Sequence, residues 1–150
     1  MHKKAASLTL AVVGLTPLLL LGPAPQASAA SCPGTGCNGE IAANTTCVND
    51  AYVAEEKTMY QGSTAVGIIE LEYSPSCRSA WARVVSNLSY GSQAEVQNNS
   101  YYEECAGSEV AGTGCNTRMV DDISPLASVA AGWVYNGSSQ GAYYEVTAAY

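Results

Sequence analysis

The stretch Glu70–Val85, ELEYSPSCRSAWARVV, carries the clearest structural pattern in the chain. Leu71 and Tyr73 alternate with two glutamates, which is the period of a strand with one buried face. A Ser-Pro-Ser turn follows at 74–76, and residues 80–85 alternate again as a second strand. The stretch therefore predicts a β-hairpin with a cysteine at its corner and a tryptophan on its return strand. It contains no obvious catalytic residue.

Residues 1–29 have the pattern of a secretory signal peptide. Two lysines form a basic start, a largely apolar run covers 8–21, and Ala27-Ser28-Ala29 resembles a cleavage site. Lipidation at Cys32 is the alternative, although the residues before it lack the leucine that such sites carry. No later segment has the apolar length of a membrane-spanning helix. We expect a secreted, extracellular protein whose mature part, residues 30–150, is one domain with an N-terminal arm at about 30–46.

The charge of the mature chain excludes several classes of function. Two of the six Lys and Arg residues and the single histidine, His2, lie within the signal peptide, whereas all 13 acidic residues lie outside it. Four basic residues are too few for a patch that binds nucleic acid or an anionic membrane. Without histidine, a Ser-His-Asp or Cys-His pair and a His-ligated metal are excluded as well. We therefore expect no enzyme activity, no metal and no cofactor.

Six cysteines remain in the mature chain, an even number in a small exported protein. Such a set predicts three disulfides rather than free thiols. Sequence does not choose among the possible pairings, and we expect the local one: Cys32 with Cys37, Cys47 with Cys77, and Cys105 with Cys115. A zinc site is the competing interpretation, but the chain has no C-x-x-C spacing that would favour it.

The mature chain consists largely of short segments with the composition of β-strands, separated by polar, Gly- and Asn-rich turns. The candidate strands lie at 51–60, 65–73, 80–85, 88–96, 101–105, 118–120, 129–135 and 142–150. The first mixes charged and aromatic residues on both sides, as edge strands do. Many short strands and no long helical period predict an all-β fold, a small disulfide-stapled β-sandwich.

Tyrosine and tryptophan supply the aromatic bulk, since the chain has ten Tyr, two Trp and no Phe. The tyrosine ring has an apolar body and a polar tip, so it suits both a thin core and a recognition surface. We expect Trp81 and Trp133 to be core anchors and the tyrosines to form cross-strand pairs. A dedicated aromatic binding face, with tryptophans that stack on sugars, is the alternative.

Three adjacent acidic pairs are candidates for a functional role: Glu55-Glu56, Glu103-Glu104 and Asp121-Asp122. A glycoside hydrolase needs two carboxylates that face each other across a cleft, whereas neighbouring residues on a strand point to opposite sides. The calcium loop pattern D-x-D-x-D-G is absent, so Asp121-Asp122 would contribute only to a looser calcium site. We expect all three pairs to be solvated charges that favour solubility.

Three motifs resemble a known family: Cys32-x4-Cys37-Asn38-Gly39, Cys47-x-Asn49-Asp50-Ala51, and the block from Ile69 to Arg83. Together they resemble the small secreted YjfA-like proteins of actinobacteria and some bacilli. This chain departs from that pattern in an acidic residue at position 72 and in its third cysteine pair. The resemblance implies a β-sandwich. Some members resemble the adaptor subunits of secreted umbrella toxin particles, which join a lectin subunit to a large repeat protein.

We therefore expect a non-catalytic adaptor whose partners are other secreted proteins, such as a lectin-like subunit and a large repeat protein. The N-terminal arm is polar and pinned by two cysteines, so we expect it to project and to bind a partner. The partner-binding residues expected there are Ser31, Pro33, Gly34, Thr35, Gly36 and Asn38. An arm that folds back over the sandwich is the alternative. A secreted carboxylate-based hydrolase and a protease inhibitor are the alternative functions.

Overall fold

The computed structural model describes residues 31–124, 126–137 and 141–150, so the expected signal peptide lies outside the described residues. Three short 3₁₀ helices come first: η1 (Gly34–Cys37), η2 (Ala42–Asn44) and η3 (Thr46–Asn49). The strands follow: β1 (Tyr52–Gln61), β2 (Thr64–Ser74), β3 (Ser79–Ser86), β4 (Ser92–Gln97), β5 (Tyr102–Gly107), β6 (Thr113–Asn116), β7 (Val120–Asp121), β8 (Val129–Tyr135) and β9 (Ala142–Val146).

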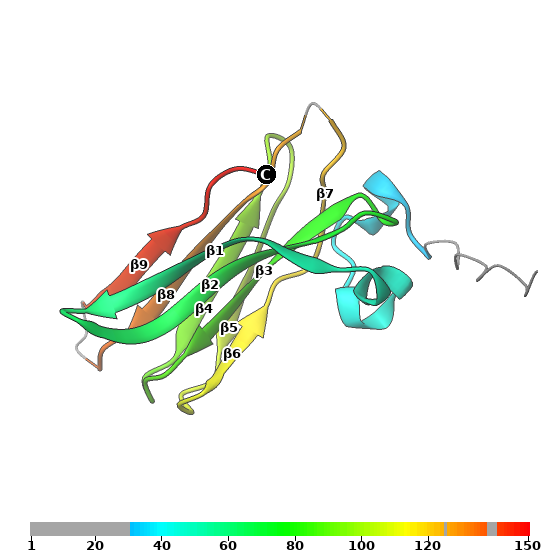
Figure 1. Cartoon of the computed structure of the whole chain (residues 1–150). Helices are drawn as coiled ribbons and strands as arrows, with labels where there is room; N and C mark the ends of the chain where they lie inside the picture. The colour runs from blue at the N-terminus through cyan, green and yellow to red at the C-terminus, as the bar shows by residue number, and fades with distance from the viewer. Residues whose placement is uncertain (1–30, 125, 138–140) are drawn as a thin grey trace, which may run out of the picture.

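Two antiparallel sheets pack face to face, which confirms the all-β fold expected from the strand pattern (Figure 1). Sheet A has the order β1-β2-β3-β6, with β7 paired to the start of β3. Sheet B has the order β5-β4-β8-β9. The predicted hairpin is β2–β3, with Tyr73 opposite Ala80 and Glu70 opposite Arg83. Its alternation is the expected one, because Leu71 is buried in the core and Glu70 and Glu72 lie on the other face.

The main core lies between the sheets and is built from aliphatic residues. Ile69, Leu71 and Val84 of sheet A belong to one buried cluster with Val96 and Val134 of sheet B. The sheets approach closely, because a Cβ atom placed on Gly132 would lie 2.8 Å from the Cβ of Ile69. A larger residue at that position would force the two layers apart.

Both edges of the sandwich are tied from one sheet to the other. At one edge, the Cys105–Cys115 disulfide joins β5 of sheet B to β6 of sheet A. At the other edge, the hydroxyl of Tyr52 on β1 forms a hydrogen bond with the hydroxyl of Tyr150, which follows β9. These links close the two sides of a sandwich whose core is thin.

The N-terminal arm, here residues 31–49, folds back against sheet A, and the expectation that it projects is wrong (Figure 1). Trp81 explains why. Its partner across the hairpin is Glu72, so its ring points away from the main core and needs separate cover. The arm supplies that cover in a second buried cluster, made of Cys37, Ala42, Cys47, Cys77, Trp81 and Met119. Backbone hydrogen bonds from Gly39 N to Met119 O and from Met119 N to Glu40 O, each 2.9 Å, hold it in place.

Candidate functional site

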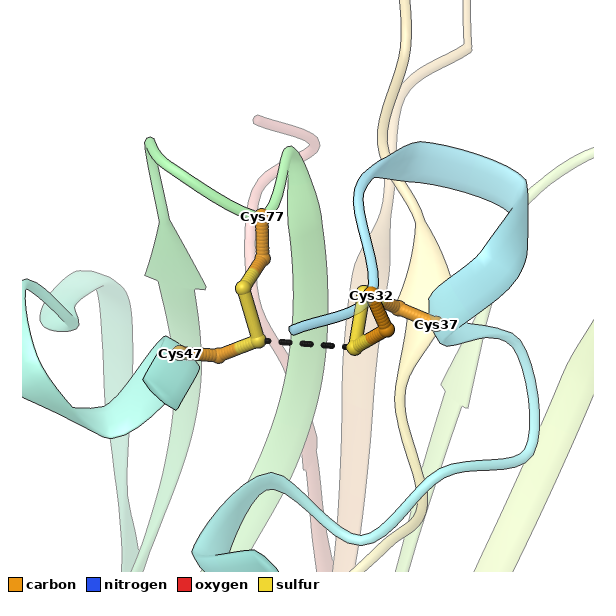
Figure 2. A group of neighbouring side chains, drawn as sticks. All are labelled: Cys32, Cys37, Cys47 and Cys77. Atoms are coloured by element: carbon orange, nitrogen blue, oxygen red, sulfur yellow. Dashed lines mark hydrogen bonds between the residues drawn. A yellow bond between two sulfur atoms is a disulfide. The ribbon is translucent and has the colours of Figure 1, made fainter. Parts of the chain in front are cut away.

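Four cysteines from the arm and the hairpin corner meet at one end of sheet A (Figure 2). Their sulfur atoms all lie within 4.8 Å of one another, and the Sγ atoms of Cys32 and Cys47 are 3.7 Å apart. The sulfurs are joined in pairs, Cys32 to Cys37 and Cys47 to Cys77, as sequence proximity favoured. A tetrathiolate zinc site needs four free thiolates, so this disulfide-bonded cluster does not offer one. It fastens the arm to the hairpin.

Asp50 fastens the end of the arm to the same hairpin corner. Its carboxylate accepts hydrogen bonds from Ser74 Oγ at 2.6 Å, Ser76 N at 2.8 Å and Ser76 Oγ at 3.1 Å. Partial desolvation acts to raise the pKa of Asp50, but these hydrogen bonds together hold it below its usual value. The role of this carboxylate is therefore structural.

The residues expected to bind a partner through the arm have mixed environments. Ser31, Pro33, Thr35 and Gly36 are exposed, whereas Gly34 is buried. Gly34 adopts a positive φ of 58°, and a Cβ there would lie 2.6 Å from a side-chain carbon of Ile123.

The two inward members of that set are held by hydrogen bonds. The N–H of Gly34 donates to the carbonyl of Cys77 at 2.6 Å. Asn38 Oδ1 accepts from the N–H of Asp121 at 2.5 Å. Gly34 and Asn38 thus serve packing, and only the exposed members of the set are accessible to a partner.

A small depression separates the arm from the outer face of sheet A. It has a volume of about 240 Å³ and lies between the arm residues Ile41, Ala42, Ala43 and Val48 and the sheet residues Glu72, Trp81, Arg83, Asn116 and Thr117. We call it the arm notch. Burial raises the pKa of Glu72, while a hydrogen bond from Trp81 and the charge of Arg83 partly oppose that effect. Ile41 and Val48 are 42% and 46% exposed, so the notch has an apolar rim beside charged groups.

The outer face of sheet B is rich in aromatic residues. Trp133 lies there, half-buried, with its ring centroid 4.8 Å from that of Tyr144. The expectation that Trp133 anchors the core is therefore wrong, because the alternation of β8 places Ala130, Gly132 and Val134 inside instead. We call seven of the outward residues of this sheet the aromatic face: Gln93, Glu95, Tyr102, Glu104, Trp133, Tyr135 and Tyr144.

Polar groups on the aromatic face are linked to its tyrosines. The hydroxyl of Tyr135 donates to Gln93 Oε1, and that of Tyr102 donates to Glu104 Oε2, each at 2.9 Å. Partial desolvation, followed by hydrogen bonds to Glu95 and Glu104, raises the pKa of Tyr102. A shallow depression of about 280 Å³ lies beside these groups, lined by Gln93, Glu104, Cys105 and Ala106. Exposed aromatic rings with polar groups between them form a surface suited to binding.

The third acidic pair differs from its expected solvated state. Asp121 and Asp122 are 4% and 9% exposed. Asn98 Nδ2 donates to the backbone carbonyl of Asp121 at 2.5 Å. Burial, followed by the charge of Asp121, raises the pKa of Asp122 to about 6, although Ser128 acts in the opposite direction.

The described residues bring only one group of three or more candidate metal-ligating side chains together, the cysteine cluster. Among the described residues, none of the three acidic pairs therefore gathers with another carboxylate into a group that could hold calcium. Within the part of the chain that the structure describes, no helix has the length and apolar character needed to cross a membrane.

Comparison with known proteins identifies one matching protein family and one similar protein. The family described as "Protein of unknown function (DUF2690)" matches residues 35–131, more than half of the chain. "Uncharacterized protein YjfA" of Bacillus subtilis (strain 168) is 31% identical over 99 residues, and the alignment covers 57% of this chain and 63% of YjfA. The chain thus matches less than two thirds of that relative's length. No solved structure matches the chain. The similarity to YjfA agrees with the motifs around the hairpin, and the chain belongs to the YjfA-like DUF2690 family.

Proposed function

We propose that the protein is a secreted, non-catalytic adaptor that joins other proteins in an extracellular, toxin-like assembly. As part of this proposal, the protein resembles the adaptor subunits of umbrella toxin particles from actinobacteria. Its partners would then be a lectin-like subunit and a large repeat protein. One observation carries the proposal: the two outer faces of the sandwich differ in chemistry, so they suit two different partners at once.

Sheet B offers the first surface. Tyr102, Tyr135 and Tyr144 on the aromatic face are 49%, 37% and 50% exposed. Tyrosine and tryptophan are enriched in protein interfaces, because a rigid ring buries a large area at a low cost in conformational entropy. Lysine, which interfaces tend to exclude, does not occur on this sheet.

Sheet A offers the second surface, the arm notch, on the opposite side of the molecule. Its exposed Ile41 and Val48 stand beside Glu72 and Arg83, so it combines an apolar contact with charges of both signs. A partner bound there is separated from the aromatic face by the thickness of both sheets. The two surfaces can therefore be occupied together, as an adaptor requires.

Co-purification of the tagged protein from the culture supernatant of its native host tests the proposal. We expect two stable partners with the wild type. The double variant Trp133→Ala/Tyr144→Ala should lose one partner, and Ile41→Asp/Val48→Asp should lose the other. Tyr60→Ala is the control, because Tyr60 on β1 is 56% exposed and belongs to neither the arm notch nor the aromatic face. Recovery of a lone monomer, or both partners retained by both double variants, would overturn the proposal.

A further inference from the structure

The aromatic face contains a pair of like charges that its sheet does not neutralise. Glu95 on β4 lies directly opposite Glu104 on β5, and both side chains are on the outer side. Like charges directly opposite each other on neighbouring strands destabilise a sheet. The hydroxyl of Tyr102 donates to Glu104 and also lies beside Glu95, and the amide of Gln93 donates to Glu95 Oε1 at 3.5 Å. These neutral groups contact both carboxylates without supplying a positive charge.

The distribution of basic residues over the chain makes this pair unusual. Lys57, Arg78, Arg83 and Arg118 are the basic residues of the mature chain. Lys57 and Arg83 lie on strands of sheet A, Arg78 lies at its hairpin corner, and Arg118 lies between β6 and β7. The segments that form sheet B contain no Lys, Arg or His. The outer side of sheet B is therefore negative, and it should repel anionic ligands and attract a cation.

Aromatic rings stand within reach of the carboxylate pair. Gln93 lies opposite Trp133, so Glu95, two residues along β4, is the diagonal neighbour of Trp133. Diagonal neighbours on adjacent strands are separated by about 7–8 Å, a gap that one side chain can fill. The residue directly opposite Glu95 on β8 is the small Ala131, which leaves room above the sheet. The depression beside Gln93 and Glu104 lies on the same surface.

We propose that the aromatic face binds a partner segment through an arginine side chain, whose guanidinium pairs with Glu95 and Glu104 and lies against the ring of Trp133. This inference rests on the proposed function and names the chemistry of one partner. A guanidinium offers five donors in a planar fork, so it can pair with two carboxylates and stack on an aromatic ring at once. Tyr144, stacked on Trp133, extends the apolar platform under the neighbouring residues of the segment.

The probe for the test is a capped pentapeptide, Gly-Gly-Arg-Gly-Gly, compared with the same peptide in which citrulline replaces arginine. Citrulline keeps the shape and removes the charge. NMR titration of the full mature protein should show amide shift changes centred on Glu95, Glu104 and Trp133 with the arginine peptide. The citrulline peptide should bind at least about tenfold more weakly, because the charge-assisted contacts are lost.

Two double variants of equal charge change make the test specific. Glu95→Gln/Glu104→Gln should weaken binding of the arginine peptide at least about tenfold and raise the melting temperature, since it removes the repulsion. Glu55→Gln/Glu56→Gln on β1 is the matched control and should change the affinity less than about twofold. Equal weakening by both variants would mean a diffuse charge effect and would overturn the inference. Equal binding of the two peptides would do the same.

Further outcomes separate this inference from the proposed function. If cellohexaose, a neutral oligosaccharide, shifts these resonances more strongly than the arginine peptide, the face binds sugar and the inference is wrong. If Glu95→Gln/Glu104→Gln retains the native partner that Trp133→Ala/Tyr144→Ala loses, the adaptor role stands and the arginine contact fails. If both of these double variants lose that partner, the result supports the adaptor role and the arginine contact.

Discussion

Tyr52 of sheet A and Tyr150 of the chain segment beside sheet B share a hydrogen bond between their hydroxyl groups. Tyr73 completes the cluster, with its ring centroid 5.9 Å from that of Tyr52 and 5.1 Å from that of Tyr150. The cluster lies opposite the edge that the Cys105–Cys115 disulfide closes. One side of the sandwich is thus tied covalently and the other by aromatic packing and a hydroxyl contact.

The tyrosine pair should be visible in a pH titration. The hydrogen bond with Tyr150, followed by desolvation, raises the pKa of Tyr52 to about 12. The pKa of Tyr52 is thus higher in the folded protein than in the unfolded chain. The contribution of the Tyr52–Tyr150 hydrogen bond to stability is therefore complete below about pH 10 and is lost as the pH rises towards about 12. We expect Tyr150→Phe to lower the pKa of Tyr52, as measured by tyrosinate absorbance. Tyr90→Phe is the control, and an unchanged Tyr52 titration in Tyr150→Phe would contradict the assignment.

The disulfides of the cysteine cluster should differ in their effect on stability. The Cys47–Cys77 bridge spans a sequence separation of 30, and the Cys32–Cys37 bridge spans 5. In the chain-entropy model, the longer loop corresponds to about 3–4 kcal/mol and the shorter one to about 2 kcal/mol. We expect urea denaturation of Cys47→Ser/Cys77→Ser and Cys32→Ser/Cys37→Ser to give losses in that order. The reverse order would show that the arm depends mainly on its own bridge.

The two tryptophans should respond very differently to truncation. Trp81 is 2% exposed beneath the arm, whereas Trp133 is half-buried on the outer side of sheet B. We expect Trp81→Ala to lower the free energy of unfolding by about 3–5 kcal/mol, because it leaves a cavity in the second cluster. Trp133→Ala should cost only about 1 kcal/mol, since its ring lies on the outer side of sheet B, where water can fill the space that it leaves. Equal losses in the free energy of unfolding for the two variants would contradict the buried position of Trp81 or the outer position of Trp133.

The strand pattern predicted the sandwich well, but it did not predict which face of each strand is covered. Alternation shows that Trp81 and Leu71 lie on opposite sides of the hairpin, and only the folded arm shows that both sides are buried. The same limit led to the wrong expectation for Trp133. The strand pattern also did not predict a strand at Thr113–Asn116, because glycine-rich segments favour turns. In the structure this segment pairs with β3 and forms β6.

Register shifts explain a further difference in β1. Simple alternation places Tyr52 and Met59 on opposite faces of the strand. In the structure, Tyr52 pairs with Tyr73 and Met59 pairs with Gly67, so both lie on the inner side. Irregularities between Val53 and Glu55 and between Met59 and Tyr60 interrupt the alternation. The binding surfaces were harder to predict than the core for a related reason, since they combine residues from several strands whose registers a single sequence does not specify.

Asp122 should make the protein more stable in mild acid. Its folded pKa of about 6 lies above the usual value of 3.8, mainly because of burial. A raised carboxyl pKa means that the folded state holds the proton more tightly. The stabilising contribution is therefore complete below about pH 4 and is lost as the pH rises through about 6.

The variant Asp122→Asn isolates this group, because it keeps the side-chain shape and removes the titration. We expect it to raise the free energy of unfolding at about pH 7 by about 1 kcal/mol, after allowance for solvent screening, and to flatten the dependence between about pH 4 and 7. Asp50→Asn is the matched control with the opposite sign. The pKa of Asp50 is lowered, so its contribution is lost as the pH falls, and its removal should destabilise the protein at about pH 7. Urea unfolding across this pH range measures both, and an Asp122→Asn profile parallel to that of the wild type would show that Asp122 does not titrate there.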